Sequence, residues 1–398
     1  MAPPHALGPL PYHHAVVDYL KTEERALWDW FASARAREDY TASLRLALLK
    51  STYRLDADAH PDLSRAAAGA RAALGLDVPL TIYQAQQSGA LNAALYFIPT
   101  EAHLVLTGPL LALLDPVETG AVLGHELAHH VLWRAADGDF LVADRIVQAI
   151  ADDPRAAPSH AQTARRYRLY TEIFADRGGV RVGGGVEPMV AALVKMHTGL
   201  PQVSAASYLR QADDIFSGRA PVKAADTSHP EDFIRARALR LWAEGAADVE
   251  AAIAAMIEGD VTLDELDLVD QRRLTQLTRR LVEQLLRPAW FRTDAVLGHA
   301  ALFFTDVRPA GADDPGLPAA LRFEDLRLRE YLCYVLLDFA AADPELDELP
   351  LAATWEWSRR LGLDAPFEKL LVSELGLKPR ALKRLTQQAA EMLRRVEA

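Results

Sequence analysis

Apolar positions along the chain recur mainly at helical spacing, with one short region of strand spacing around residue 90. Helical periodicity is found in residues 15–50, 60–77, 115–136, 164–180 and 186–216, and in nearly everything after residue 246. Segments rich in β-branched and aromatic residues predict strands at 78–86, 91–99 and 102–108. We therefore expect an α+β, predominantly helical fold, with a small sheet in the N-terminal half followed by all-α C-terminal modules.

Local signals predict where three of the helices begin or end. Asp115 is the expected N-cap of the helix at 115–136, with Pro116 at its first helical position. Gly75 is expected to close the helix at 60–77. The pair Gly178-Gly179 is expected to stop the helix at 164–180.

Composition and turn signals also suggest how the chain divides. A stretch rich in Pro, Gly and Asp at 307–320, "VRPAGADDPGLPAA", is the best linker candidate. The other expected parts are an N-terminal helical region, a domain that contains the sheet, a helical bundle segment and a C-terminal helical domain, at residues 1–74, 75–245, 246–306 and 321–398.

Charge and cysteine content narrow the class of protein. The 398-residue chain carries a formal net charge of -12, which disfavours binding to nucleic acid or anionic membranes. Its single cysteine, Cys333, excludes an intramolecular disulfide framework and fits a reducing compartment. No apolar run is long enough for a membrane span, and no signal peptide is visible. We predict a soluble, cytoplasmic protein that binds neither nucleic acid nor membrane.

The helix at 115–136 contains the motif H-E-x-x-H, which runs from His125 to His129. Histidines at i and i+4 project from consecutive turns of one face, so both neutral imidazoles can bind one zinc ion. Glu126 is placed to take a proton from zinc-bound water and pass it to a leaving amine. The alternative is polar residues on a partly buried helix. The rest of this helix is apolar, however, and burying polar side chains without partners costs several kcal/mol.

A catalytic zinc takes three protein ligands and leaves one position for water, so another element should supply the third ligand. Glu172 and Asp176 share a face of the helix at 164–180 because they are four residues apart. One carboxylate can bind the metal while the other accepts a hydrogen bond from a ligand histidine. The alternative is a solvated acidic face, but the three residues that follow Glu172 are apolar and favour a buried site.

The blocks "GHELAHH", "TEIFADRGG" and "SHPEDFIRARAL" occur in this order, and residues 75–245 resemble the M48 metallopeptidases. These gluzincins include HtpX-type and CAAX-processing proteases, whose membrane-spanning helices this chain lacks. The resemblance implies Zn²⁺ bound by His125, His129 and Glu172, with Glu126 as the general base. It also implies that Asp176 supports the ligands from behind.

The resemblance implies roles for four further residues. Asn92 and Ala93 correspond to a strand beside the substrate cleft, and His229 or Arg235 would stabilise the oxyanion of the tetrahedral intermediate. The alternative is that His229 caps the next helix and Arg235 makes a structural salt bridge. The segment 137–163 lies between the ligand-bearing helices, and the sequence leaves open whether it covers the cleft.

Outside this region the sequence supports fewer predictions. Residues 321–398 resemble the TerB-type helical domain of tellurite-resistance proteins, with Pro344 where that family usually has Gly. Trp355 and Trp357, two residues apart on a helix, are not expected to face one core. His13 and His14 are expected at the surface. An acidic turn would either bind a divalent cation or cap the following helix, and contains Asp343, Glu345, Asp347 and Glu348.

Together these features predict a soluble zinc endopeptidase that acts on a protein or peptide substrate. Its C-terminal helical domains would serve for regulation or for binding a partner protein. The alternative is a catalytically silent or latent zinc-containing interaction protein, whose site is structural. The intact Glu126 favours the enzyme, because a silent site has no chemical use for a base at that position.

Overall fold

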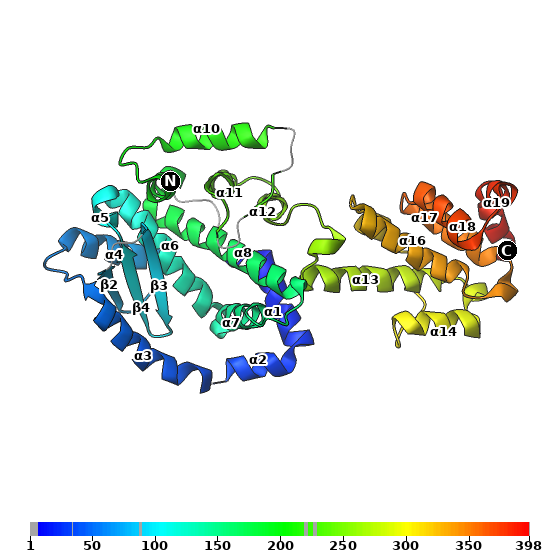
Figure 1. The fold of residues 1–398 in the computed structure, drawn as a ribbon, viewed down its shortest axis with the longest axis horizontal. Coiled ribbons are helices and arrows are strands. Elements are labelled where there is room, and N and C mark those ends of the chain that lie inside the picture. Colours follow the sequence, from blue (N-terminus) through cyan, green and yellow to red (C-terminus); the bar gives the residue numbers. More distant parts are fainter. Residues whose placement is uncertain (1–6, 34, 87–89, 219–221, 226–228, 398) are drawn as a thin grey trace. The chain divides into compact units, whose positions relative to one another are not determined.

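The computed structural model describes residues 7–33, 35–86, 90–218, 222–225 and 229–397, and its ribbon is drawn in Figure 1. The chain forms two compact units, Met1–Gly259 and Asp260–Ala398. The first unit combines a small sheet with helices, and the described part of the second contains only helices. The predicted α+β, predominantly helical fold is confirmed. None of the described helices combines the length and apolar character needed to cross a bilayer.

The sheet of the first unit is mixed and has the strand order β1-β2-β4-β3. β2 and β4 run parallel, whereas β1 and β3 are antiparallel to their neighbours. β3 is therefore an edge strand, and it is paired with β4 from Asn92 to Ile98. The sequence predicted three of these strands and missed the short β1. The bounds are β1 (Thr52–Arg54), β2 (Leu80–Ala85), β3 (Asn92–Ile98) and β4 (Glu101–Thr107).

Helices surround this sheet and form most of the first unit (Figure 1). The predicted helical segments at 15–50 and 186–216 are each divided, the second because Gly199 adopts a left-handed conformation with φ of 70°. The helices are α1 (Pro11–Glu23), α2 (Arg25–Ala32), α3 (Arg35–Ser51), α4 (Pro61–Leu74), α5 (Leu110–Leu113), α6 (Pro116–Arg134), α7 (Asp139–Ala151), α8 (Pro158–Gly183), α9 (Val186–Thr198), α10 (Ala205–Phe216), α11 (Asp232–Glu244) and α12 (Val249–Glu258).

The predicted ends of two helices are confirmed. The Asp115 side chain accepts hydrogen bonds from the N–H groups of Val117 and Glu118, which makes it the N-cap of α6. Gly75 ends α4 in the left-handed conformation, with φ of 65°. α4 and α6 lie against one face of the sheet and share an apolar core with it, and the end of α3 packs on the other face.

The predicted stop at Gly178-Gly179 is wrong, because α8 continues through both glycines to Gly183. The two glycines instead allow α8 to approach its neighbours closely. A Cβ atom on Gly178 would overlap with the Ala128 side chain of α6. On the opposite helix, a Cβ atom on Gly124 would lie 2.7 Å from Cβ of Val182. Missing side chains on both helices thus let α6 and α8 cross in direct backbone contact.

The surface position predicted for His13 is also wrong, whereas His14 is exposed as expected. His13 is fully buried where α1 packs on α8, among the rings of Tyr167 and Phe174. Its Nδ1 accepts a hydrogen bond from the backbone N–H of Leu10 at 3.0 Å. Burial lowers the pKa of His13 to about 3, so it is a neutral core residue at physiological pH.

The second unit is built around one apolar core that includes both Trp355 and Trp357, which are 4% and 8% exposed. The prediction that they would not share a core is wrong, because α17 has neighbouring helices on more than one side. The helices are α13 (Leu268–Leu285), α14 (Asp294–Phe303), α15 (Leu317–Ala320), α16 (Leu326–Ala340), α17 (Leu349–Arg360), α18 (Asp364–Leu375) and α19 (Pro379–Glu397).

The acidic turn before α17 uses its first carboxylate for local hydrogen bonds. Asp343 accepts from the N–H of Glu345 and from the hydroxyl of Thr293. This arrangement resembles the capping alternative, although the capped element is the short 3₁₀ turn at Pro344–Leu346. Among the described residues, the group able to hold a metal ion lies in the first unit and includes none of these carboxylates.

We predict that Gly178→Ala lowers the free energy of unfolding by about 1–3 kcal/mol, because overpacking against Ala128 outweighs the helix propensity gained. Urea denaturation followed by circular dichroism measures the change. Gly69→Ala is the matched control, since a Cβ atom there meets no atom within 4 Å. That control should gain up to about 1 kcal/mol. Equal stabilisation by both substitutions would contradict the close crossing.

Candidate metal centre

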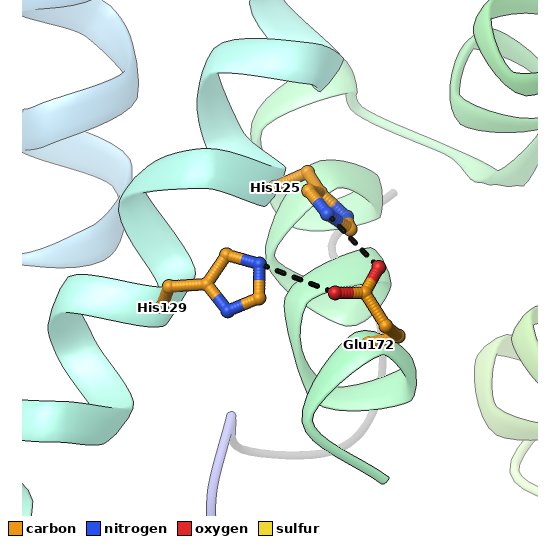
Figure 2. A group of neighbouring side chains, drawn as sticks. All are labelled: His125, His129 and Glu172. Carbon is orange, nitrogen blue, oxygen red and sulfur yellow. Dashed lines mark ion pairs between the residues drawn. The ribbon is translucent and has the colours of Figure 1, made fainter. Parts of the chain in front are cut away.

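The crossing of α6 and α8 brings together the predicted zinc ligands. His125 and His129 extend from consecutive turns of α6 toward Glu172 on α8 (Figure 2). His125 Nε2 lies 3.5 Å from Glu172 Oε2, and His129 Nε2 lies 3.7 Å from Glu172 Oε1. The three possible ligand atoms all lie within 4.8 Å of one another, and all three residues are buried. One ion can therefore contact all of them.

Asp176 lies one turn beyond Glu172 and holds His125 from behind. Its Oδ1 is 2.9 Å from Nδ1 of His125, so the carboxylate accepts a hydrogen bond from that nitrogen. A proton on Nδ1 leaves the lone pair of Nε2 directed toward Glu172 and the ion position. Of the two carboxylates, Glu172 faces both histidines and Asp176 orients one of them.

Arg235 of α11 is bound to Asp176 by two hydrogen bonds. Its Nε and Nη2 donate to the two carboxylate oxygens at 2.7 Å and 2.6 Å. Both residues are buried, and the same Nη2 lies 3.7 Å from Glu172 Oε2. The geometry matches the salt-bridge alternative for Arg235, which fixes Asp176 and so the His125 ring.

His229 reaches the centre from the loop before α11. Its Nδ1 lies 2.9 Å from Glu172 Oε2, while 54% of its side chain is exposed. Capping of the next helix, the alternative for this residue, is not observed, because α11 starts at Asp232 and its N-cap is Glu231. His229 therefore stands at the open side of the centre, with one nitrogen beside a ligand and the rest of its ring accessible.

The protonation of the site depends on burial and neighbouring charge. Burial lowers the pKa of His129 to about 4, which keeps its imidazole neutral. Burial has the same effect on His125, but the hydrogen bond to Asp176 and the charge of Glu172 outweigh it and raise its pKa. Burial opposes ionisation of Glu172, yet the hydrogen bond with His229 and the nearby histidines hold its pKa below the ordinary value.

Glu126 is buried beside the two histidines. Burial, supported by the charge of Glu172, raises the pKa of its carboxyl group to about 7. The backbone N–H of Leu95 in β3 donates a hydrogen bond to it and partly offsets this effect. A carboxyl group with a pKa near neutrality can both accept and release a proton, as general acid–base chemistry requires.

The donor set fits Zn²⁺. Two imidazole nitrogens and a carboxylate are the ligands of one common class of catalytic zinc sites, which leave a further position open. Three buried carboxylates also meet here, from Glu126, Glu172 and Asp176, and Arg235 balances the charge of only one. The remaining negative charge favours a divalent cation between His125, His129 and Glu172.

The centre opens into a cavity of about 250 Å³. Asn92 and Ala93 of β3 line it, as do His229 and Arg235, so the structure brings every predicted site residue to or directly behind one cavity. The segment 137–163 does not contribute to its lining; α7 packs instead against α8 and α2. Apolar side chains also line it, namely Val122 of α6 and Met189, Leu193 and Met196 of α9.

Sequence reasoning missed one aromatic neighbour of the ligands. Trp133 stacks on the ring of His129, with centroids 5.5 Å apart and planes at 29°. Its position four residues after His129 places it on the same face of α6, a signal that was present in the sequence. The apolar wall formed by α9 had no comparable signal, because its residues meet the centre only through the tertiary fold.

Comparisons with known proteins agree with this geometry. Residues 56–243 match the model of Peptidase family M48. No curated protein and no solved structure matches the chain. The matched segment includes the sheet strands β2 to β4, both ligand-bearing helices and Arg235, and it ends before the second unit. The match supports the M48 peptidase family, and with it a protease, for this part of the chain.

Proposed function

We propose that this protein is a zinc-dependent endopeptidase, with Zn²⁺ held by His125, His129 and Glu172. The observation that carries the proposal is the buried convergence of their three ligand atoms within 4.8 Å, with Glu126 beside them. A bound Zn²⁺ supplies Lewis acidity, which polarises the carbonyl group of a peptide bond and makes water a better nucleophile. The chain supplies the positioning and the proton transfers.

Glu126 is the proposed general base. Its carboxylate accepts the proton from the attacking water and then donates it to the amine that leaves when the C–N bond breaks. Burial makes this carboxylate a better proton acceptor, because it raises the pKa of the group. Asp176 and Arg235 do not touch the reacting atoms. They keep His125 in one tautomer and one orientation.

The substrate is proposed to bind as an extended strand along β3. β3 is an edge strand of the sheet, and Asn92 and Ala93 line the metal cavity at its start. Backbone groups of an edge strand pair with an added peptide, which would place a peptide bond in front of Glu126. Main-chain pairing is insensitive to sequence, so it fits a protein or peptide substrate without naming one.

His229 is the proposed oxyanion donor. Its exposed imidazole stands beside Glu172 at the open side of the cavity, whereas Arg235 is already engaged by Asp176. A donor placed where charge develops stabilises the tetrahedral intermediate. For the second unit, a separate compact unit of helices, the proposed role is regulation or the binding of a partner protein.

The metal content of the purified full-length protein tests the ligand set. Wild-type protein, purified without added metal and analysed by inductively coupled plasma mass spectrometry, should hold about one zinc per chain. Glu172→Ala should lose most of it, because one of three protein ligands is removed. Glu187→Ala, an exposed acid on α9, should retain it. A wild-type chain that stays empty after zinc is supplied would rule out the site.

The role of Glu126 is tested with Glu126→Gln, which keeps the shape of the side chain and removes the base. Peptide cleavage should fall by roughly 10²–10⁴-fold while zinc content is unchanged. Cleavage of a proteome-derived peptide library, read by mass spectrometry, measures the activity. A Glu126→Gln protein as active as the wild type would refute the proposed mechanism.

His229 and Arg235 should respond differently to substitution. His229→Ala should lower kcat by roughly 10²-fold at nearly unchanged stability, because the side chain is half exposed and acts on the transition state. Arg235→Met removes the guanidinium that neutralises the buried Asp176 carboxylate and should lower the free energy of unfolding by about 3–5 kcal/mol.

Cleavage rates and urea denaturation of both variants separate these two effects. A stable, zinc-loaded Arg235→Met protein with a large loss of kcat would instead assign the oxyanion to Arg235. Normal activity of His229→Ala would exclude His229 from that role.

A further inference from the structure

A second cavity, of about 320 Å³, lies beyond the metal centre at the far end of β3. Aromatic rings from three elements line it: Phe31 of α2, Phe97 of β3 and Trp133 of α6. Leu141 and Val142 of α7 add further apolar lining, and the charged residues Arg134, Asp137 and Arg145 also line the cavity. None of the roles proposed for the metal centre uses this cavity.

Stacked rings connect the second cavity to the metal centre. Trp133 stacks on His129 on one side and meets Phe97 edge-on, with centroids 5.6 Å apart, on the other. Phe97 also packs on His130, the residue after the ligand, at 4.7 Å. The second cavity therefore begins one ring away from a proposed zinc ligand.

β3 passes both cavities in turn. Asn92, Ala93 and Ala94 line the metal cavity, the N–H of Leu95 reaches Glu126, and Phe97 lines the second cavity. Residues of a strand are spaced about 3.4 Å apart and alternate between its faces. A peptide paired with β3 and cleaved opposite Leu95 would thus place a side chain at the second cavity roughly two or three residues from the cleaved bond.

Two further observations suggest that the cavity binds something. Trp133 Nε1 is buried and has no hydrogen-bond partner among the described residues, although a buried indole N–H usually has one. The turn that brings α7 opposite Trp133 is strained, because Ala136 and Asp137 have φ of 49° and 56°. Such left-handed residues cost about 1 kcal/mol or more each and are concentrated at functional sites.

We propose that this second cavity, bounded by Phe31, Phe97, Trp133 and Val142, is a substrate subsite. It takes a bulky apolar side chain of the peptide roughly two or three residues from the hydrolysed bond. The inference rests on the proposed function for the identity of its occupant, an extended peptide paired with β3.

Val142→Trp adds bulk at a residue that lines the cavity and is not a proposed zinc ligand. Ala149→Trp, an exposed position on the same helix, is the matched control for added bulk. Val142→Ala enlarges the cavity and serves where the filled variant does not fold. Zinc content and circular dichroism of all three full-length variants show that the centre is intact.

The cleavage experiment uses a proteome-derived peptide library and mass spectrometry of the cleavage sites. Wild type and Ala149→Trp should enrich Phe, Leu, Met or Trp at one position two or three residues from the cut. Pairs of synthetic peptides that carry either Phe or Ala at this position should differ in kcat/KM by about tenfold or more, with the Phe peptide cleaved faster. Val142→Trp should lose this preference, and Val142→Ala should shift it toward Trp.

Binding of the same library to immobilised Glu126→Gln protein, with and without Val142→Trp, separates the two proposals. One outcome is that the wild type cleaves no peptide, while apolar peptides are retained by the protein with Val142 and not by the Val142→Trp protein. This outcome would overturn the proposed peptidase activity and support the subsite. Cleavage with no apolar preference at that position would overturn the subsite alone. A preference unchanged in Val142→Trp would also overturn it, as would failure of the library both to bind and to be cleaved.

Discussion

The close crossing of α6 and α8 is the constraint on which the rest of the first unit depends. Gly124 and Gly178 face each other there, and a Cβ atom on either would clash with the opposite helix. Only at this separation do two histidines on one helix and a glutamate on the other bring their ligand atoms within 4.8 Å. A wider crossing would separate Glu172 from both imidazoles. The three proposed ligands can therefore meet only if small residues occupy the crossing.

Ion pairs also connect the crossing of α6 and α8 to α11. Asp176 is fully buried between His125 and Arg235, so a proposed ligand, a carboxylate and a guanidinium of α11 form one hydrogen-bonded chain. Each member is expensive to bury alone and acceptable only with the others. A divalent cation at the three ligands would complete this balance, which couples metal binding to the docking of α11 on α8.

The sequence allowed prediction of those parts of the site that depend on spacing within one helix. The four-residue intervals from His125 to His129 and from Glu172 to Asp176 identified both faces, and the structure brings them together. Features set by tertiary contact were misread. A glycine pair looks the same whether it ends a helix or admits a neighbour, so α8 was predicted too short. His13 was placed at the surface because nothing near it in sequence shows that α1 packs on α8.

The metal centre and the second cavity are built largely from different elements, which bears on substrate specificity. The proposed zinc ligands and the proposed base lie on two largely buried helices, where substitution carries a cost in packing. The second cavity draws also on α2, α7 and the end of β3, and the Trp133 ring joins it to His129. None of His125, Glu126 and Glu172 lines it. Under the proposed function, selection of the substrate and hydrolysis of the peptide bond would therefore depend largely on different elements of one fold.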